Sequence, residues 1–213
     1  MSTNIAKGTN SAYELRVKRK PVYDVVSRLF DILLSFISLI IALPIVLIVA
    51  IAIKLEDGGP VLYSQIRMGK NGKKFTVYKM RSMRVDGAEN RSLSETAIND
   101  SRITKVGKFI RVMRIDEIPQ LINILVGQMK LIGPRPLVPE QIEEYSKELP
   151  EFINRLAVKP GLTGLAQVSG GNDLLPDEKL TLDVEYIEKR GFSLDLKIIL
   201  KTVGVVLSGD GAR

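Results

Sequence analysis

The sequence predicts a mainly helical α+β protein with an N-terminal re-entrant membrane helix-hairpin, a small β-hairpin and amphipathic helices at the membrane interface. Three observations predict this class. Residues 32–53 form an uncharged apolar run in a chain of 213 residues. Residues 61–80 hold two segments rich in β-forming residues around an Asn-Gly turn. Much of the remaining chain places apolar residues at helical spacing among charged ones.

The apolar run has about 22 residues, which is roughly the length that spans a bilayer. Both of its flanks are basic. Lys18, Arg19, Lys20 and Arg28 precede the run, and Lys54, Arg67, Lys70, Lys73 and Lys74 follow it. A spanning helix would place one basic flank outside the cell, against the positive-inside tendency.

Pro44 lies near the middle of the run, where a proline removes a helix hydrogen bond and favours a kink. Each half then has about 11 residues, or about 16 Å of helix, which is too short to cross a bilayer alone. We therefore expect a helix–break–helix hairpin that enters and leaves on one face, with Pro44 as the membrane break. Ser35 and Ser38 would satisfy carbonyls freed at the break. A simple membrane-spanning helix with a proline kink is the alternative.

The chain divides accordingly into three parts. Residues 1–20 form a polar N-terminal tail, and residues 21–56 form the re-entrant anchor. Residues 57–213 are expected to form a cytoplasmic domain that lies on the membrane and holds the candidate catalytic residues described below. The sequence shows no internal repeat that would divide this domain further.

The first elements of the domain are two predicted strands, over residues 61–68 and 73–80, joined by a turn at 70–73. Residues 84–100 are polar and are predicted to hold a short helix and a mobile loop. Residues 104–114 mix apolar and basic side chains in a pattern that fits an amphipathic helix in the membrane interface. An ordinary surface helix of a soluble core is the alternative for that segment.

A second predicted helix covers residues 117–126, with Asp116 as its N-cap, Pro119 in its first turn and Gly127 at its end. Four further helices are expected, over residues 136–147, 150–156, 176–189 and 193–207.

The composition removes several classes of chemistry. The chain has no Cys and no His, so disulfides, thiolate catalysis, Fe–S ligation and the usual histidine base or zinc ligand are absent. Its formal charge of +7 suits an anionic partner such as a nucleotide, a nucleic acid or an anionic membrane leaflet. Nucleic-acid binding is the weakest of these, because aromatic residues are few and no recognition motif is present.

Asp116 and Glu117 are the strongest candidates for catalysis. Two adjacent acids at a helix start can simply cap the helix and complement its dipole. However, Arg111 and Arg114 stand just before them, where guanidinium groups would hold phosphate oxygens. An aspartate can attack phosphorus to form an acyl phosphate, and a glutamate can hold Mg²⁺. We therefore predict phosphoanhydride cleavage with Asp116 and Glu117 as catalytic residues, Glu117 as the ligand of a Mg²⁺ cofactor and Arg111 as a phosphate contact.

Four other residues are candidate phosphate or substrate contacts. Arg135 stands between two prolines, which would pre-organise its guanidinium for bidentate phosphate binding. Lys79 and Arg81 end the second predicted strand, where lysine also commonly guards a sheet edge. Gln167 ends the turn-rich segment 159–167, a candidate backbone nest for an anion or a base.

Taken together, these segments resemble the bacterial sugar transferases, and in particular the small single-domain type of monotopic polyprenyl-phosphate phosphoglycosyl transferase. The resemblance runs from about residue 21 to residue 206 and keeps the family's order. The matching pieces are GPVLYSQIRMGKNGKKFTVYKMRSM (59–83), DSRITKVGKFIR (100–111), IDEIPQLINILVGQMKLIGPRP (115–136), KPGLTGLAQVSG (159–170) and LDVEYIEKRGFSLDLKIILKTV (182–203).

The resemblance implies a reaction and a location. A UDP-sugar would lose its sugar phosphate to the nucleophile Asp116, UMP would leave, and the phosphosugar would pass to undecaprenyl phosphate. Glu117 would be the Mg²⁺ ligand, and Arg135 the arginine of the family's Pro-Arg-Pro turn. The family's anchor is a re-entrant hairpin in the bacterial inner membrane, with the catalytic domain on the cytoplasmic face. The reaction is the first membrane step of a glycan pathway (capsule, O-antigen, exopolysaccharide or glycoprotein).

The chain departs from the family's pattern at three places. Leu43-Pro44 replaces Ser-Pro at the break, Lys130 replaces the serine of Met-Ser-Leu, and Gly171 replaces the arginine of Gly-Arg. None of these departures removes the adjacent acids Asp116 and Glu117, referred to below as the dyad.

Two other functions stay open on the sequence alone. One is a non-catalytic basic membrane adaptor. The other is a conventional glycosyltransferase that releases UDP, although the Asp-x-Asp motif common in such enzymes is absent. The sequence leaves the transferred sugar and the oligomeric state open, and a homo-oligomer is among the expected states.

Overall fold

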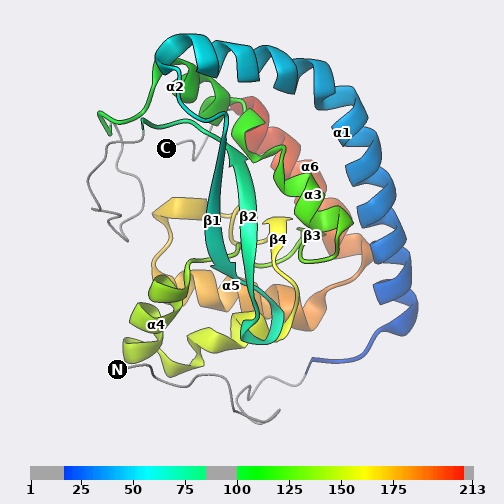
Figure 1. Ribbon diagram of the computed structural model, residues 1–213. Coiled ribbons are helices and arrows are strands. Elements are labelled where there is room, and N and C mark those ends of the chain that lie inside the picture. Colours follow the sequence, from blue (N-terminus) through cyan, green and yellow to red (C-terminus); the bar gives the residue numbers. More distant parts are fainter. Residues whose placement is uncertain (1–16, 85–99, 209–213) are drawn as a thin grey trace.

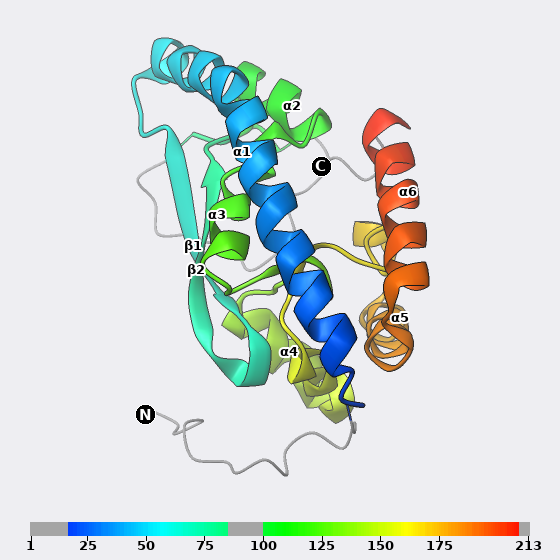
Figure 2. The ribbon, with the colours of Figure 1, turned by 90° about the vertical axis from the view of Figure 1, so that its right-hand side faces the viewer.

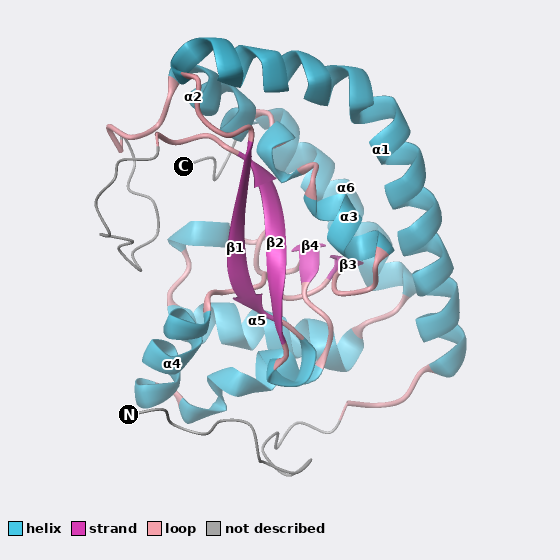
Figure 3. Ribbon diagram, viewed as in Figure 1, coloured by secondary structure: helices cyan, strands magenta, loops and turns pink. Residues whose placement is uncertain are grey.

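The computed structural model describes residues 17–84 and 100–208, and in this part of the chain it is mainly helical with two small sheets (Figures 1 and 3). The predicted α+β class with a small β-hairpin is therefore confirmed. Most of the predicted polar tail, and the helix and loop predicted within residues 84–100, lie outside the described residues.

The chain opens with a single long helix, α1 (Pro21–Asp57), which has 37 residues. It ends at Gly58, whose left-handed backbone (φ 71°) lets its N–H donate to the carbonyl of Lys54 at 3.0 Å. Pro44 lies inside the helix, and the helix changes direction along its length (Figure 1). A proline removes one N–H and leaves the hydrogen bonds of the flanking turns in place, so a helix can bend without ending. The structure thus has one bent helix instead of two helices and a break, and the re-entrant hairpin stays a prediction.

Helix α1 turns its apolar side chains outward. Among the described residues it is the one helix long and apolar enough to cross a membrane, and only 11% of its most apolar stretch is buried. A core helix of a soluble protein would bury most of that stretch. Its buried positions in the first half are polar or amphipathic: Tyr23, Ser27, Asp31 and Ser35. The apolar outer surface makes α1 compatible with membrane association.

Strands β1 (Leu62–Met68) and β2 (Lys74–Met80) form the predicted antiparallel hairpin, with Leu62 opposite Met80 and Met68 opposite Lys74. The short 3₁₀ turn η1 (Lys70–Gly72) joins them. Asn71 and Gly72 both adopt positive φ, which explains why Asn-Gly stands there. The prediction of this hairpin is confirmed to within a residue at each strand.

A second sheet was not predicted. Strand β3 (Lys130–Ile132) runs parallel to β4 (Gly161–Thr163). Strands of three residues are too short to show the alternation that identifies a strand in sequence. This pairing sets the segment after β3 directly against residues 159–164, and a side chain at Gly161 would collide with the backbone of Gly133.

Five further α-helices follow in the described part: α2 (Lys105–Val112), α3 (Gln120–Leu125), α4 (Pro139–Glu148), α5 (Pro176–Lys189) and α6 (Phe192–Ser208). Three short 3₁₀ segments accompany them: η2 (Ile115–Glu117), η3 (Pro150–Ala157) and η4 (Gly171–Asp173). The prediction for α5 is confirmed at both ends. The predicted helix start at Pro136 is wrong: Val138 is extended, as expected for a residue before a proline, and α4 begins at Pro139.

Helix α3 lies between the β1–β2 hairpin and α1 in both ribbon views (Figures 1 and 2). One core cluster fills this space, from Phe75 and Val77 of β2 and from Leu121, Ile124 and Met129. The hairpin and α3 are therefore packed as one unit, and this unit positions the side chains that surround the acidic pair.

Candidate active site

The acidic pair lies in η2, before helix α3 begins. Arg114 has a left-handed backbone (φ 55°) that redirects the chain after α2, and α3 starts only after Pro119. The predicted role of Asp116 as N-cap of a helix from residue 117 is therefore wrong. The turn places both carboxylates inside the protein, with Asp116 at 7% and Glu117 at 8% exposure.

Glu117 is bound by two cations. Its Oε1 accepts hydrogen bonds from Lys79 Nζ at 3.0 Å and from Arg135 NH2 at 2.7 Å. Burial alone would raise the pKa of Glu117, but the charges and hydrogen bonds of Arg135 and Lys79 hold it well below its usual range. Glu117 is therefore ionised at neutral pH and fixed in place.

Asp116 has the opposite electrostatic balance. Burial raises the pKa of Asp116; the positive charge of Lys79 opposes this rise, and the negative charge of Glu117 adds to it. Two adjacent carboxylates are thus pushed apart in proton affinity, a pattern that marks carboxylates with different chemical roles. The environment keeps Glu117 ionised at neutral pH and makes Asp116 the more basic carboxylate of the two.

Four cationic side chains surround the pair: Lys79 of β2, Arg111 of α2, Arg135 of the turn after β3, and Arg67 of β1. Arg111 donates from Nε to Ser82 Oγ at 2.8 Å, and burial lowers its pKa. Burial and the nearby charge of Arg135 lower the pKa of Arg67 to about 10. Four cations around two carboxylates leave a net positive site, which suits a diphosphate.

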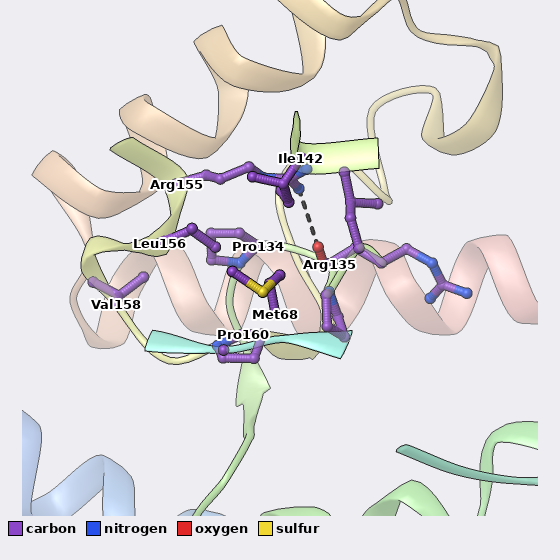
Figure 4. A pocket seen from close by; sticks show the side chains of 11 residues that line it. Met68, Pro134, Arg135, Ile142, Arg155, Leu156, Val158 and Pro160 are labelled. Carbon is purple, nitrogen blue, oxygen red and sulfur yellow. Dashed lines mark hydrogen bonds between the residues drawn. The ribbon is translucent and has the colours of Figure 1, made fainter. Parts of the chain in front are cut away.

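The turn that carries Arg135 separates the charged site from a small cavity. Figure 4 shows the Arg135 side chain extending away from the cavity, while its backbone carbonyl faces Arg155. Met68, Pro134, Ile142, Leu156 and Val158 are among the lining residues, and the cavity volume is about 10 Å³. That is room for about one water molecule, so this cavity is not the substrate site.

Two predicted contacts make other interactions in the structure. Arg81 is buried and forms an ion pair with Asp57 at the end of α1, so it joins the hairpin to α1. The amide of Gln167 lies against Gly164, and both of its polar atoms are buried without a hydrogen-bond partner among the described residues. Lys79, Arg111 and Arg135 of the predicted set are brought to the dyad, and Arg81 and Gln167 are not joined to it by hydrogen bonds.

Sequence reasoning missed Arg67 at the site and Asn123, which links two of the elements that support the site. Arg67 counted only as a flanking charge, although it stands in a conspicuously basic stretch of the hairpin. Asn123 is fully buried in α3, and its Nδ2 donates to the carbonyl of Thr76 at 2.7 Å and to Gln128 Oε1 at 2.8 Å. An asparagine within the otherwise apolar run Leu-Ile-Asn-Ile-Leu was the signal for this link between α3 and β2.

The donor set fits Mg²⁺ bound together with a phosphate substrate. Within residues 17–84 and 100–208, no group of three or more His, Cys, Asp or Glu side chains is placed to enclose a metal ion. Magnesium is usually held by one or two carboxylates, with substrate phosphates and water as its other ligands. Asp116 and Glu117 supply carboxylates of that kind, inside cationic surroundings that would attract the phosphates.

A family model and several known proteins match most of the chain. A family model described as bacterial sugar transferase matches residues 22–209. Across 196 residues the chain is 40% identical to a UDP-N-acetylgalactosamine-undecaprenyl-phosphate N-acetylgalactosaminephosphotransferase of Aeromonas hydrophila, covering 91% of this chain and 46% of that relative. It is 39% identical to a UDP-glucose:undecaprenyl-phosphate glucose-1-phosphate transferase of Caulobacter vibrioides, covering 89% and 72%. It is also 39% identical to the uncharacterized sugar transferase EpsL of Bacillus subtilis, covering 89% and 91%.

Proposed function

Because this chain belongs to the bacterial sugar transferase family, we propose that it transfers a sugar 1-phosphate from a UDP-sugar to undecaprenyl phosphate and releases UMP. The observation that carries the proposal is the buried pair Asp116-Glu117. The ionised Glu117 forms ion pairs with Lys79 and Arg135, while Asp116 is the more basic carboxylate. In the proposed reaction, one carboxylate acts as the nucleophile and the second stays anionic.

The relatives support the same reaction class, because their names specify phosphotransfer to undecaprenyl phosphate. The chain spans 46% of the Aeromonas relative and 72% of the Caulobacter relative, so the substrates are part of the proposal. The relatives are named for different sugars, and the sugar of this chain is therefore left to experiment.

In the first step, an oxygen of Asp116 attacks the phosphorus that carries the sugar. The bond between this phosphorus and the bridging oxygen breaks, the electron pair goes to UMP, and the phosphosugar remains on Asp116 as an acyl phosphate. Arg135, Lys79 and Arg111 face the negative charge that develops on the phosphoryl oxygens and on the leaving UMP. Burial of Asp116 removes the water that would otherwise solvate the nucleophile.

In the second step, a phosphate oxygen of undecaprenyl phosphate attacks the same phosphorus. The bond to Asp116 breaks, and the carboxylate is regenerated with the formation of a polyprenyl diphosphosugar. No proton transfer to or from a histidine is needed, which is consistent with a chain that lacks histidine.

We assign Glu117 as the residue that would hold Mg²⁺. The bound ion would neutralise charge on the diphosphate. Lys79 and Arg135 hold Glu117 ionised and oriented for this role.

We also propose that residues 21–56 act as a re-entrant anchor in the bacterial inner membrane, with residues 57–213 on its cytoplasmic face. The exposed apolar surface of α1 supports membrane contact. Phe109 and Val112 of α2, with Met113 at its C-cap, add exposed apolar side chains beside basic ones. The chain has no cysteine, so one cysteine at Lys20 or at Lys54 becomes a unique reporter. Labelling of both from the cytoplasmic side supports the re-entrant path, and labelling of the two from opposite sides refutes it.

The reaction is tested with detergent-purified protein, undecaprenyl phosphate, Mg²⁺ and a panel of UDP-sugars. The proposal predicts release of UMP with one or a few of these sugars. Release of UDP would instead identify a conventional glycosyltransferase. Binding to anionic liposomes with no nucleotide release from any UDP-sugar would identify a basic membrane adaptor.

A further inference from the structure

The backbone around Arg135 is held at four consecutive carbonyls. The carbonyls of Pro134 and Leu137 accept from the backbone N–H groups of Gly161 and Met68, both at 2.9 Å. The carbonyl of Pro136 accepts from Arg67 NH1 at 3.2 Å. The carbonyl of Arg135 itself accepts from Arg155 NH2 at 3.1 Å. Since two prolines also restrict this turn, the direction in which the Arg135 side chain leaves the backbone is closely fixed.

Arg155 is the buried side chain in this set. It belongs to η3, and its NH2 also lies 2.7 Å from Asp183 Oδ2 of α5, with side-chain exposures of 3% and 1%. Its guanidinium lies 4.8 Å from the ring centre of Phe152, which is fully buried. A buried ion pair commonly adds little net stability compared with apolar residues of similar volume. We therefore interpret the Arg155–Asp183 pair as orienting its neighbours, and not mainly as stabilising the fold.

Arg155 has no contact with the acidic pair in the part of the chain that is described. Figure 4 shows its guanidinium meeting the Arg135 carbonyl on one side of the turn, while the Arg135 side chain leaves on the other side. That side chain ends 2.7 Å from Glu117 Oε1. The path from Asp183 to Arg155, to the Arg135 backbone and then to Glu117 is continuous in hydrogen bonds and ion pairs.

We propose that Arg155, held by Asp183, is a positioning residue for Arg135 in the transfer reaction. It fixes the backbone of the turn so that the Arg135 guanidinium meets Glu117 and the substrate phosphate in one orientation. The inference rests on the proposed function, because only turnover shows whether the orientation of Arg135 matters. A displacement of about 1 Å in such a group is enough to lower a rate by about 100-fold.

A double-mutant cycle separates this role from general support of the fold. Arg155→Met with Asp183→Leu removes the pair without leaving a lone buried charge. Arg135→Lys keeps the positive charge but loses the bidentate hydrogen bonding of the guanidinium. The rates of UMP release are compared for wild type, the pair-removal variant, Arg135→Lys and the combination. Lys189→Gln with Glu185→Gln removes an exposed ion pair of α5, the helix that also carries Asp183, and serves as the control.

We expect pair removal to lower kcat/KM by about 10- to 100-fold in the wild-type background and by less than about threefold in the Arg135→Lys background, because interacting residues are not additive. The control variant retains the wild-type rate. An equal fold-change in both backgrounds, or no change in either, would overturn the proposal. If the pair-removal variant does not fold, Arg155→Lys takes its place in the cycle under the same two criteria.

The wild-type rate reports separately on the underlying function. An active wild type with equal effects in both backgrounds overturns the positioning role alone. A wild type that releases no UMP from any UDP-sugar overturns the proposed function and the positioning role with it.

Discussion

The acidic pair and the first half of α1 both bury polar groups, but their partners differ. At the acidic pair, Glu117 is matched by the full charges of Lys79 and Arg135. In α1, Asp31 accepts the backbone N–H of Leu131 at 3.0 Å, and Ser27 accepts from Lys130 Nζ at 2.9 Å. The site gathers four cations around two adjacent carboxylates, whereas the buried stripe of α1 holds one carboxylate, Asp31, and serves as a docking face against β3.

The difference explains why α1 is apolar outside. Tyr23, Ser27, Asp31 and Ser35 recur every four residues and so lie on one face of the helix. That face meets the domain, which leaves the apolar side chains of the other face exposed and compatible with membrane association. Strand β3, which α1 contacts, leads directly into the turn of Arg135, so the anchor and the site share one support.

Asp116→Asn is the change with the largest expected effect on the site. It retains the shape of the side chain but removes the nucleophile, and we expect the rate of UMP release to fall by on the order of 10³-fold or more. The folded state should be kept, as circular dichroism would show. A variant with full turnover would contradict the role of Asp116.

Arg135→Ala comes next. It removes one of the two cations on Glu117 and one phosphate contact, and we expect a loss of about 10²- to 10³-fold in kcat. Leu175→Ala changes an exposed apolar residue outside the site and serves as a control, because its rate should stay at the wild-type value. A rate for Arg135→Ala within a factor of two of wild type would show that the turn does not act in catalysis.

Ile48→Asp tests the outer face of α1, where Ile48 is 68% exposed. A carboxylate at the centre of a membrane helix costs about 2.5–3.5 kcal/mol in insertion. We therefore expect less protein in the floating fraction of a membrane flotation gradient, with an unchanged fold in detergent. Equal flotation of Ile48→Asp and wild type would place this face away from lipid.

The smallest expected effects are on stability, and they have opposite signs within the dyad. The raised pKa of Asp116 means that its charged form is disfavoured in the folded state, so Asp116→Asn should raise the Tm at pH 7. Because the pKa of Glu117 is lower in the folded state than in the unfolded state, its carboxylate stabilises the fold above the unfolded-state pKa. This stabilisation is lost as the pH falls through the folded-state pKa. Glu117→Gln should therefore lower the Tm at pH 7. Thermal unfolding of the two variants in detergent checks both signs.

Elements with local sequence signals could be predicted, whereas elements that depend on contacts distant in sequence could not. The β1–β2 hairpin and α5 were predicted closely, because an Asn-Gly turn and an amphipathic repeat are local signals. Lys79, Asp116, Glu117 and Arg135 were each predicted as site residues, but their mutual contacts depend on the fold and were not predicted. Strands β3 and β4 were missed, because a pairing of three-residue strands depends on contacts that are distant in sequence.

The turn at Asp116 and the path of α1 were the other limits. The left-handed backbone of Arg114 has no signal in the sequence, and it moves the helix start from residue 117 to Gln120. Pro44 predicted a break, but the hydrogen bonds on either side keep α1 continuous and only bent. The ion pair of Arg81 with Asp57 was not predicted, because it joins elements that are distant in sequence, and the phosphate role of Arg81 stays a prediction.

The most direct test of the central claim is intact-protein mass spectrometry after incubation with a UDP-sugar and Mg²⁺, without undecaprenyl phosphate. The account predicts a mass increase equal to one sugar phosphate, localised to Asp116, absent from Asp116→Asn and removed when undecaprenyl phosphate is added. Transfer of the phosphosugar by the wild type with no adduct at any time, or an adduct that persists in Asp116→Asn, would contradict it.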